Sequence, residues 1–143
     1  MKKNSIKEIE VKNMYIFYDN VVTRIDQDHA QYEELSHAIM EFIKDPSSCT
    51  DTLDQTFLFQ GYGKANISQL NDNWLEIHFN PSIDTNFAKN KHTGIKTLLF
   101  TLREGYLYLY EDECLNEAPS LVAYICNETA ILKLAKIIKK VNL

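Results

Sequence analysis

The chain has 143 residues, 45% of them hydrophobic and 24% charged, which is typical of one globular domain, residues 1–143, with a sizeable core. The formal net charge is −5, and residues 13–132 alone hold 7 Lys or Arg against 18 Asp or Glu. An acidic body repels phosphate and disfavours a nucleic-acid partner, and no apolar run approaches the roughly 20 residues that span a bilayer. Because the segment after Met1 is too polar for a secretory signal, we expect a cytoplasmic protein.

The first third of the chain predicts a hairpin and then a helix. Aromatic and β-branched residues fill 14–25 on both sides of Asp19-Asn20, a dipeptide suited to a two-residue turn. The helix is predicted to begin at an N-cap, Asp26 or Asp28, and to end near Lys44, just before an Asp-Pro pair. Apolar residues at helical spacing form its expected buried stripe: Tyr32, Leu35, Ile39, Phe42 and Ile43.

The middle of the chain predicts strands separated by polar segments. Residues 46–55 are expected to form a polar loop, and 56–60 a strand. Turn-forming residues between 67–70 and 74–79 predict a second hairpin. Residues 81–94 are expected to be a polar connection with one helical turn.

A third hairpin is predicted over residues 98–110, with Arg103-Glu104-Gly105 as a three-residue loop. Gly105 is expected to adopt a positive φ, which glycine tolerates because it has no Cβ. This loop length sets a register that places three tyrosines on the same face as Leu98 and Phe100. The expected cross-strand pairs are Leu98 with Tyr110, Phe100 with Tyr108, and Leu102 with Tyr106.

The last elements predicted are a strand at 121–126 and a helix capped by Asn127. The helix has an apolar stripe and a face of four lysines, which suits the negative end of the helix dipole: Ile131, Leu134, Ala135, Ile138 and Val141 against Lys133, Lys136, Lys139 and Lys140. Short turns join most strands, so most pairs should be antiparallel. The predicted fold class is α+β, a mostly antiparallel meander sheet with two helices packed on one face.

A run of tyrosines that leads into an acidic segment is the strongest candidate for a binding surface. Tyrosine is favoured at interfaces because its rigid apolar ring carries a polar tip, and carboxylates attract cationic partners. The tryptophan of the 74–79 strand is the other candidate anchor. The predicted binding residues are Trp74, Tyr106, Tyr108, Tyr110, Glu111, Asp112, Glu113 and Glu117.

The chain offers one pair with catalytic potential and no catalytic motif. Glu76 and His78 should share one side of a strand with Trp74, where they could act as general acid and base. The other side of this strand, with Leu75, Ile77 and Phe79, is the better core face. No nucleophile or phosphate-binding glycine loop lies nearby in sequence, so an enzyme is the weaker hypothesis.

No metal or cofactor is expected. His29 and His37 lie eight residues apart on the first helix, about 12 Å along its axis, which is too far for one metal ion. The cysteines, Cys49, Cys114 and Cys126, have no paired spacing and are expected to be packing residues in a reducing compartment.

The leading functional hypothesis is a binding protein that neutralises a cationic protein partner. A small acidic α+β chain without catalytic motifs is typical of bacterial immunity proteins against nuclease-type toxins. The alternatives are a small acidic secretion chaperone and a small enzyme that uses Glu76 and His78. The sequence sets neither the partner nor the oligomeric state.

Overall fold

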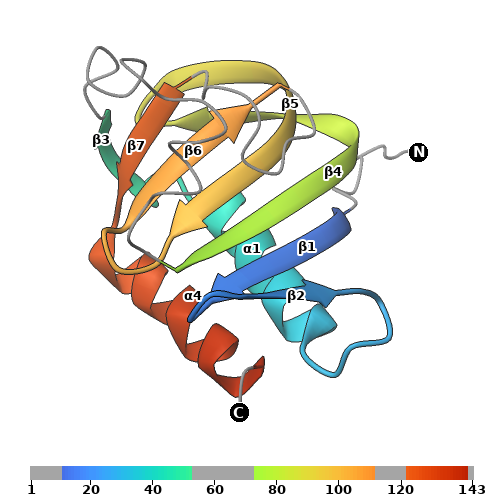
Figure 1. Ribbon diagram of the computed structural model, residues 1–143. Helices are drawn as coiled ribbons and strands as arrows, with labels where there is room; N and C mark the ends of the chain where they lie inside the picture. The colour runs from blue at the N-terminus through green and yellow to red at the C-terminus, as the bar shows by residue number, and fades with distance from the viewer. Residues whose placement is uncertain (1–10, 53–72, 112–121, 142–143) are drawn as a thin grey trace.

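Strands from the whole length of the chain hydrogen-bond into one antiparallel sheet in the computed structural model, which describes residues 11–52, 73–111 and 122–141 (Figure 1). Within these residues the sheet has 7 strands in the order β2-β1-β4-β5-β6-β7-β3. The strands are β1 Val11–Tyr18, β2 Val21–Ile25, β3 Cys49–Thr52, β4 Trp74–Phe87, β5 Asn90–Thr101, β6 Tyr106–Tyr110 and β7 Val122–Cys126. With two helices added, this confirms the predicted α+β class.

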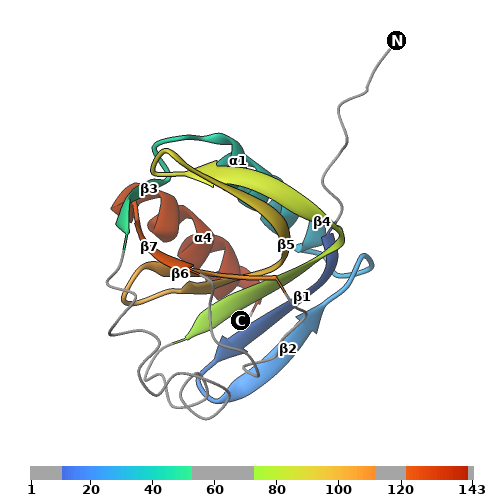
Figure 2. The ribbon, with the colours of Figure 1, turned by 90° about the horizontal axis from the view of Figure 1, so that it is seen from above.

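Both helices, α1 (Tyr32–Lys44) and α4 (Glu128–Val141), pack on the same face of the sheet, which curves around them (Figure 2). Their buried residues join the main hydrophobic core with one face of the strands. The helical members of this core are Leu35, Ala38, Ile39, Phe42, Ile43, Ile131, Leu134, Ile137 and Ile138. Neither helix is long and apolar enough to cross a membrane, so the described part of the chain contains no candidate membrane span.

The predicted cap of the last helix is confirmed. The side-chain oxygen of Asn127 accepts hydrogen bonds from the backbone N–H groups of Thr129 (2.9 Å) and Ala130 (3.4 Å). The predicted start of the first helix is wrong, because α1 begins only at Tyr32. Two consecutive turns precede it, in which Asp26 accepts from the N–H of His29, and His29 accepts from the N–H of Tyr32. The chain uses these turns to change direction between the sheet edge and the helix.

The first hairpin is confirmed, with Tyr18 opposite Val21. Its turn residues have positive φ angles, 51° at Asp19 and 68° at Asn20, as a type I′ turn requires. Asp and Asn tolerate this left-handed conformation better than most residues, which is why the dipeptide predicted the turn correctly.

The predicted polar connection at 81–94 is wrong, because these residues lengthen β4 and β5 into one long hairpin. Its turn is formed by Ala88 and Lys89, at φ 48° and 71°, without the glycine or asparagine that normally indicates such a turn. The buried positions Ile83, Thr85 and Phe87 alternate with exposed Asp84 and Asn86.

Two other predictions for the middle of the chain need correction. Residues 49–52 lie in the predicted polar loop but form the edge strand β3, which pairs with β7. The second correction concerns the predicted hairpin partner of residues 74–79: this part of β4 pairs with β1 on one side and with β5 on the other. The predicted strands at 56–60 and 67–70 lie outside the described residues.

The predicted register of the third hairpin is wrong by one residue. The turn between β5 and β6 has four residues, Leu102–Gly105, and the N–H of Gly105 donates to the carbonyl of Thr101 at 3.0 Å. Gly105 has the predicted positive φ, 78°. Because side chains alternate along a strand, this shift of one residue places Phe100 and Tyr108, which were expected to share a face, on opposite faces of the sheet. The observed pairs are Thr97 with Tyr110, Leu98 with Leu109, Leu99 with Tyr108, and Phe100 with Leu107.

Candidate functional site

The sheet face away from the helices carries a second cluster of apolar side chains. Its members come from alternate positions of neighbouring strands, so the pleat points them all to the same side. Among the residues that the structure describes, no member of this cluster lies in a helix. The buried members are Trp74, Leu99, Tyr108, Tyr110 and Ala123, and Phe17 and Tyr106 pack against them while partly exposed.

The structure brings together the four aromatic residues that the sequence singled out for binding. Trp74 on β4 and the tyrosines of β6 all lie in the second cluster, and Trp74 stacks on Phe17 with ring centroids 4.2 Å apart. Trp74, Tyr108 and Tyr110 are only 6%, 3% and 1% exposed, whereas Tyr106 is partly exposed. Most of these rings are therefore buried in the cluster, where they stabilise this face of the sheet through packing.

Among the predicted acidic binding residues, only Glu111 lies within the described part of the chain. Glu111 directly follows β6 and is exposed to solvent. Asp112, Glu113 and Glu117 lie outside the described residues.

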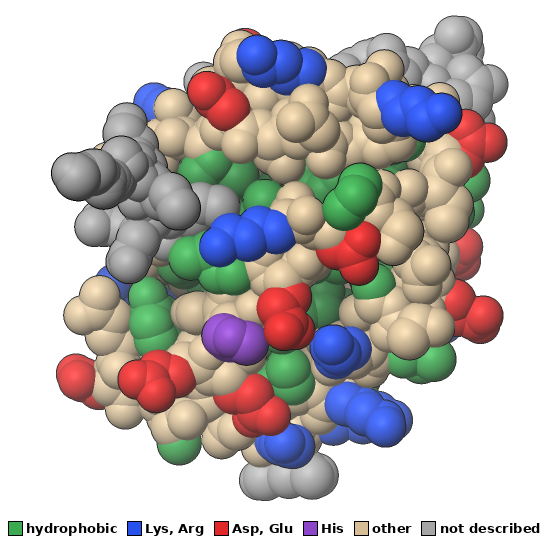
Figure 3. Space-filling model, turned by 180° about the vertical axis from the view of Figure 1, so that it is seen from behind, with side chains coloured by type: hydrophobic (Ala, Val, Ile, Leu, Met, Phe, Trp, Pro, Cys, Tyr) green, Lys and Arg blue, Asp and Glu red, His purple; other side chains and the backbone are tan. Residues whose placement is uncertain are grey.

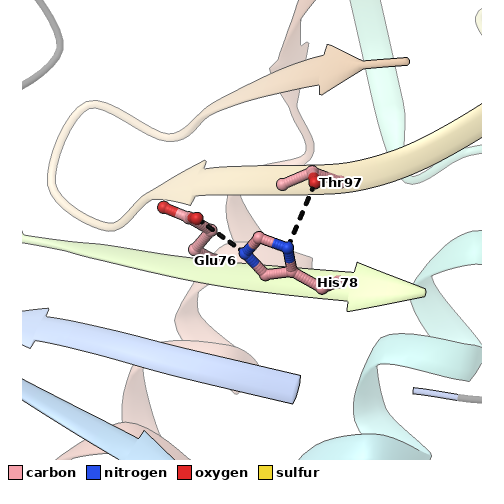
Figure 4. A network of polar contacts seen from close by, with 3 residues as sticks. All are labelled: Glu76, His78 and Thr97. Carbon is pink, nitrogen blue, oxygen red and sulfur yellow. Dashed lines mark hydrogen bonds and ion pairs between the residues drawn. The ribbon is translucent and has the colours of Figure 1, made fainter. Parts of the chain in front are cut away.

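A buried polar network crosses the same face beside the aromatic cluster (Figure 4). A Glu76 carboxylate oxygen, Oε2, lies 2.7 Å from Nε2 of the His78 ring, and Nδ1 of that ring lies 3.5 Å from the hydroxyl of Thr97. The predicted placement of Glu76 and His78 on one side of their strand is confirmed. Thr97 stands opposite His78 on β5, and the sequence missed it because only the strand register reveals this neighbour.

Burial dominates the electrostatics of this pair. Glu76 is 0% and His78 5% exposed, and the other carboxylate oxygen of Glu76, Oε1, has no hydrogen-bond partner among the described residues. Desolvation raises the pKa of Glu76, although hydrogen bonds from His78 and Trp74 act in the opposite direction. The rings of Tyr15 and His78 form a T-shaped contact, with ring centroids 5.5 Å apart. A glutamate and a histidine at this spacing are suited to acid–base chemistry, and in this structure both side chains are buried.

The raised pKa of Glu76 predicts a pH-dependent stability. Between pH 4.5 and the higher folded-state pKa, the folded protein keeps a proton that the unfolded chain releases, so stability falls as pH rises. The variant Glu76→Gln cannot titrate and should gain melting temperature relative to the unmodified protein as pH rises from 4.5 to 8. Glu34→Gln is the matched control, because hydrogen bonding to Lys140 lowers the pKa of Glu34 and reverses the sign. A difference in melting temperature between Glu76→Gln and the unmodified protein that is the same at every pH would contradict this assignment.

The two histidines of the α1 region each lie close to a neighbouring residue. The ring of His29 accepts a hydrogen bond from the N–H of Gln31 at 3.0 Å, and the exposed His37 lies 3.9 Å from Glu41. No group of three or more His, Cys, Asp or Glu side chains suited to a metal ion occurs within residues 11–52, 73–111 and 122–141.

Positive and negative side chains are interspersed on the rear face of the molecule (Figure 3). Lysines of α4 reach acidic residues of α1, with Lys140 2.9 Å from Glu34 and Lys133 3.5 Å from Glu41. The helix surface therefore has mixed rather than strongly acidic charge.

A cavity of about 320 Å³ lies between the end of α1 and the start of α4.

No protein-family model, curated protein or solved structure matches the chain.

Proposed function

We propose that this chain binds and neutralises a cationic protein, as an immunity protein does for a nuclease-type bacterial toxin. The observation that carries the proposal is the position of β6. Its tyrosines lie on the sheet face that neither helix covers, and the strand leads directly to the exposed Glu111 and the acidic sequence after it. Aromatic side chains beside carboxylates suit a basic surface on a partner.

Charge complementarity explains why such a protein would inhibit a nuclease. A nuclease binds phosphate through a basic cleft, and an acidic protein can occupy that cleft and exclude the nucleic acid. Long-range attraction also accelerates the encounter. The helix side is less suited to this task, because lysines of α4 already pair with Glu34 and Glu41 of α1.

The described residues divide into supporting and contacting groups. Trp74, Tyr108 and Tyr110 are buried, so we assign them the role of holding the face in shape. Tyr106 is partly exposed and Glu111 is exposed, so these two side chains are available to touch a partner.

Charge reversal of the acidic segment should slow association with the partner. The double variant Glu111→Lys with Glu113→Lys should associate about tenfold more slowly at low salt, because exposed carboxylates act mainly through steering. Surface plasmon resonance against the toxin domain that this chain captures from its native host measures the rate. The difference should shrink as salt rises, since the Debye length falls from about 10 Å at 0.1 M to about 3 Å at 1 M.

A matched variant separates a local contact from the effect of net charge. Asp28→Lys with Glu33→Lys makes the same charge change at exposed positions near the start of α1. It should slow association much less than the variant of the acidic segment. Equal rates for the two variants would place the interface elsewhere. Failure of this chain to restore growth of cells that make the toxin domain would contradict the immunity function itself.

Neither alternative has comparable support. A secretion chaperone needs a continuous apolar groove, whereas the exposed large apolar residues among those described are separated: Val21 and Val22 on β2, Ile125 on β7 and Leu132 on α4. An enzyme that uses Glu76 and His78 needs access for a substrate, and both residues are buried.

A further inference from the structure

Two cysteines that are far apart in the sequence stand opposite each other at one edge of the sheet. Cys49 begins the edge strand β3, Cys126 ends β7, and the two are direct partners in the antiparallel ladder. Both side chains belong to the main core, and they are 4% and 7% exposed. They therefore point to the same face of the sheet.

The backbone hydrogen bonds show which kind of pair this is. The N–H of Asn127 donates to the carbonyl of Ser48 at 2.6 Å, so these two neighbouring residues form a hydrogen-bonded pair. The N–H of Cys126 instead donates to Gly105 at 2.9 Å, on the side away from β3. Cys49 and Cys126 are therefore a non-hydrogen-bonded pair, in which side chains approach most closely and Cα atoms are about 4.5 Å apart. Disulfides usually join Cα atoms about 4.4–6.8 Å apart, so a pair of this kind has the spacing that a disulfide requires.

We propose that Cys49 and Cys126 form a reversible disulfide when the protein meets a low-molecular-weight disulfide as oxidant. One cysteine, as its thiolate, attacks the oxidant, forms a mixed disulfide and releases one small thiol. The second cysteine then attacks the mixed disulfide and releases the other small thiol. The two protein thiols lose two electrons and two protons, and the oxidant becomes two thiols.

The reaction should be slow, because the reactive form is scarce and shielded. Hydrogen bonding to the Cys49 thiol and burial hold the pKa of Cys126 far above its ordinary value, so little thiolate exists at Cys126. Access requires local opening of β3, which pairs only with β7 in the described sheet and exposes its last three residues, 50–52, to solvent. Once formed, the bond joins the segment after α1 to the segment before α4.

Oxidised glutathione is a direct probe of this proposal. The reduced full-length protein is incubated with it, quenched with acid, unfolded and alkylated, and then mapped by mass spectrometry. We expect a peptide that links Cys49 to Cys126, with Cys114 still open to alkylation. The melting temperature should rise by about 5–15 °C and return to its starting value with dithiothreitol.

Three serine variants complete the test. Cys114→Ser should keep both the linked peptide and the rise in melting temperature, whereas Cys49→Ser and Cys126→Ser should lose both. The map of the unmodified chain decides the result even if a core variant folds poorly. Linkage through Cys114, a stable glutathione adduct without linkage, or full alkylation of all thiols at equilibrium would each overturn the proposal.

Discussion

Replacing His78 by leucine is expected to lower the free energy of unfolding by about 3–5 kcal/mol at pH 8, because the change leaves Glu76 buried as an unpaired charge. The imidazole provides the 2.7 Å hydrogen bond to this carboxylate. The loss should be smaller at pH 5, where a carboxyl group with a raised pKa can take up a proton instead. Urea unfolding at both pH values, followed by far-UV circular dichroism, measures the difference.

The double variant Glu76→Val with His78→Leu is the matched control. Replacing both partners of a buried polar pair by apolar residues of similar volume is often neutral or stabilising, so the double variant should recover most of the loss. A double variant as unstable as His78→Leu would show that the pair matters through packing and not through its charge. An equal loss at pH 5 and pH 8 would contradict the proposed role of the carboxylate.

Replacing Phe100 by alanine is also expected to cost about 3–5 kcal/mol, because it leaves a cavity under the helices. Phe100 is 0% exposed, and its ring meets the ring of Phe42 on α1 in a T-shaped contact with centroids 4.9 Å apart. Guanidinium unfolding gives the size of the loss. A loss below about 1 kcal/mol would mean that this side chain is not in the main core.

Double-mutant cycles with Phe100→Ala test the register of the third hairpin. The cycle with Phe42→Ala should show a coupling of about 0.5–1.5 kcal/mol, as contacting aromatic residues do. The cycle with Tyr108→Ala should be additive within about 0.5 kcal/mol, since Tyr108 lies in the cluster on the opposite face. The reverse result would restore the register in which Phe100 and Tyr108 face each other.

Local chemistry explains the parts of the fold that were predicted correctly from the sequence. Asp19-Asn20 suits a type I′ turn, and Asn127 can cap a helix through its own side chain, so each signal acts within a few residues. Glu76 and His78 alternate with the apolar residues of one strand, so their shared side also followed from the sequence. The class of the fold and part of the site needed no long-range information.

The errors arose where the structure depends on partners that are distant in sequence or on unusual turn residues. Cys49–Thr52 is short, and three of its four residues are exposed, so only its pairing with β7 makes it a strand. Ala88 and Lys89 gave no turn signal, although the alternation from Ile83 to Phe87 could have indicated a strand. The extra residue in the turn before Gly105 reversed the faces predicted for the third hairpin. The pairing of β4 with β5, which places Thr97 beside His78, was missed because residues 81–94 were expected to be a polar connection.

The strand order also has a consequence for how the chain folds. The pairings β1–β2, β4–β5 and β5–β6 join strands that follow each other along the chain, so they close short loops at small entropic cost. The pairings β1–β4 and β3–β7 instead join strands separated by long stretches of sequence, which raises the contact order. The local hairpins can therefore form early, while the N-terminal hairpin and β3 have to dock onto them later. We therefore expect these two docking events, at opposite edges of the sheet, to limit the rate of folding.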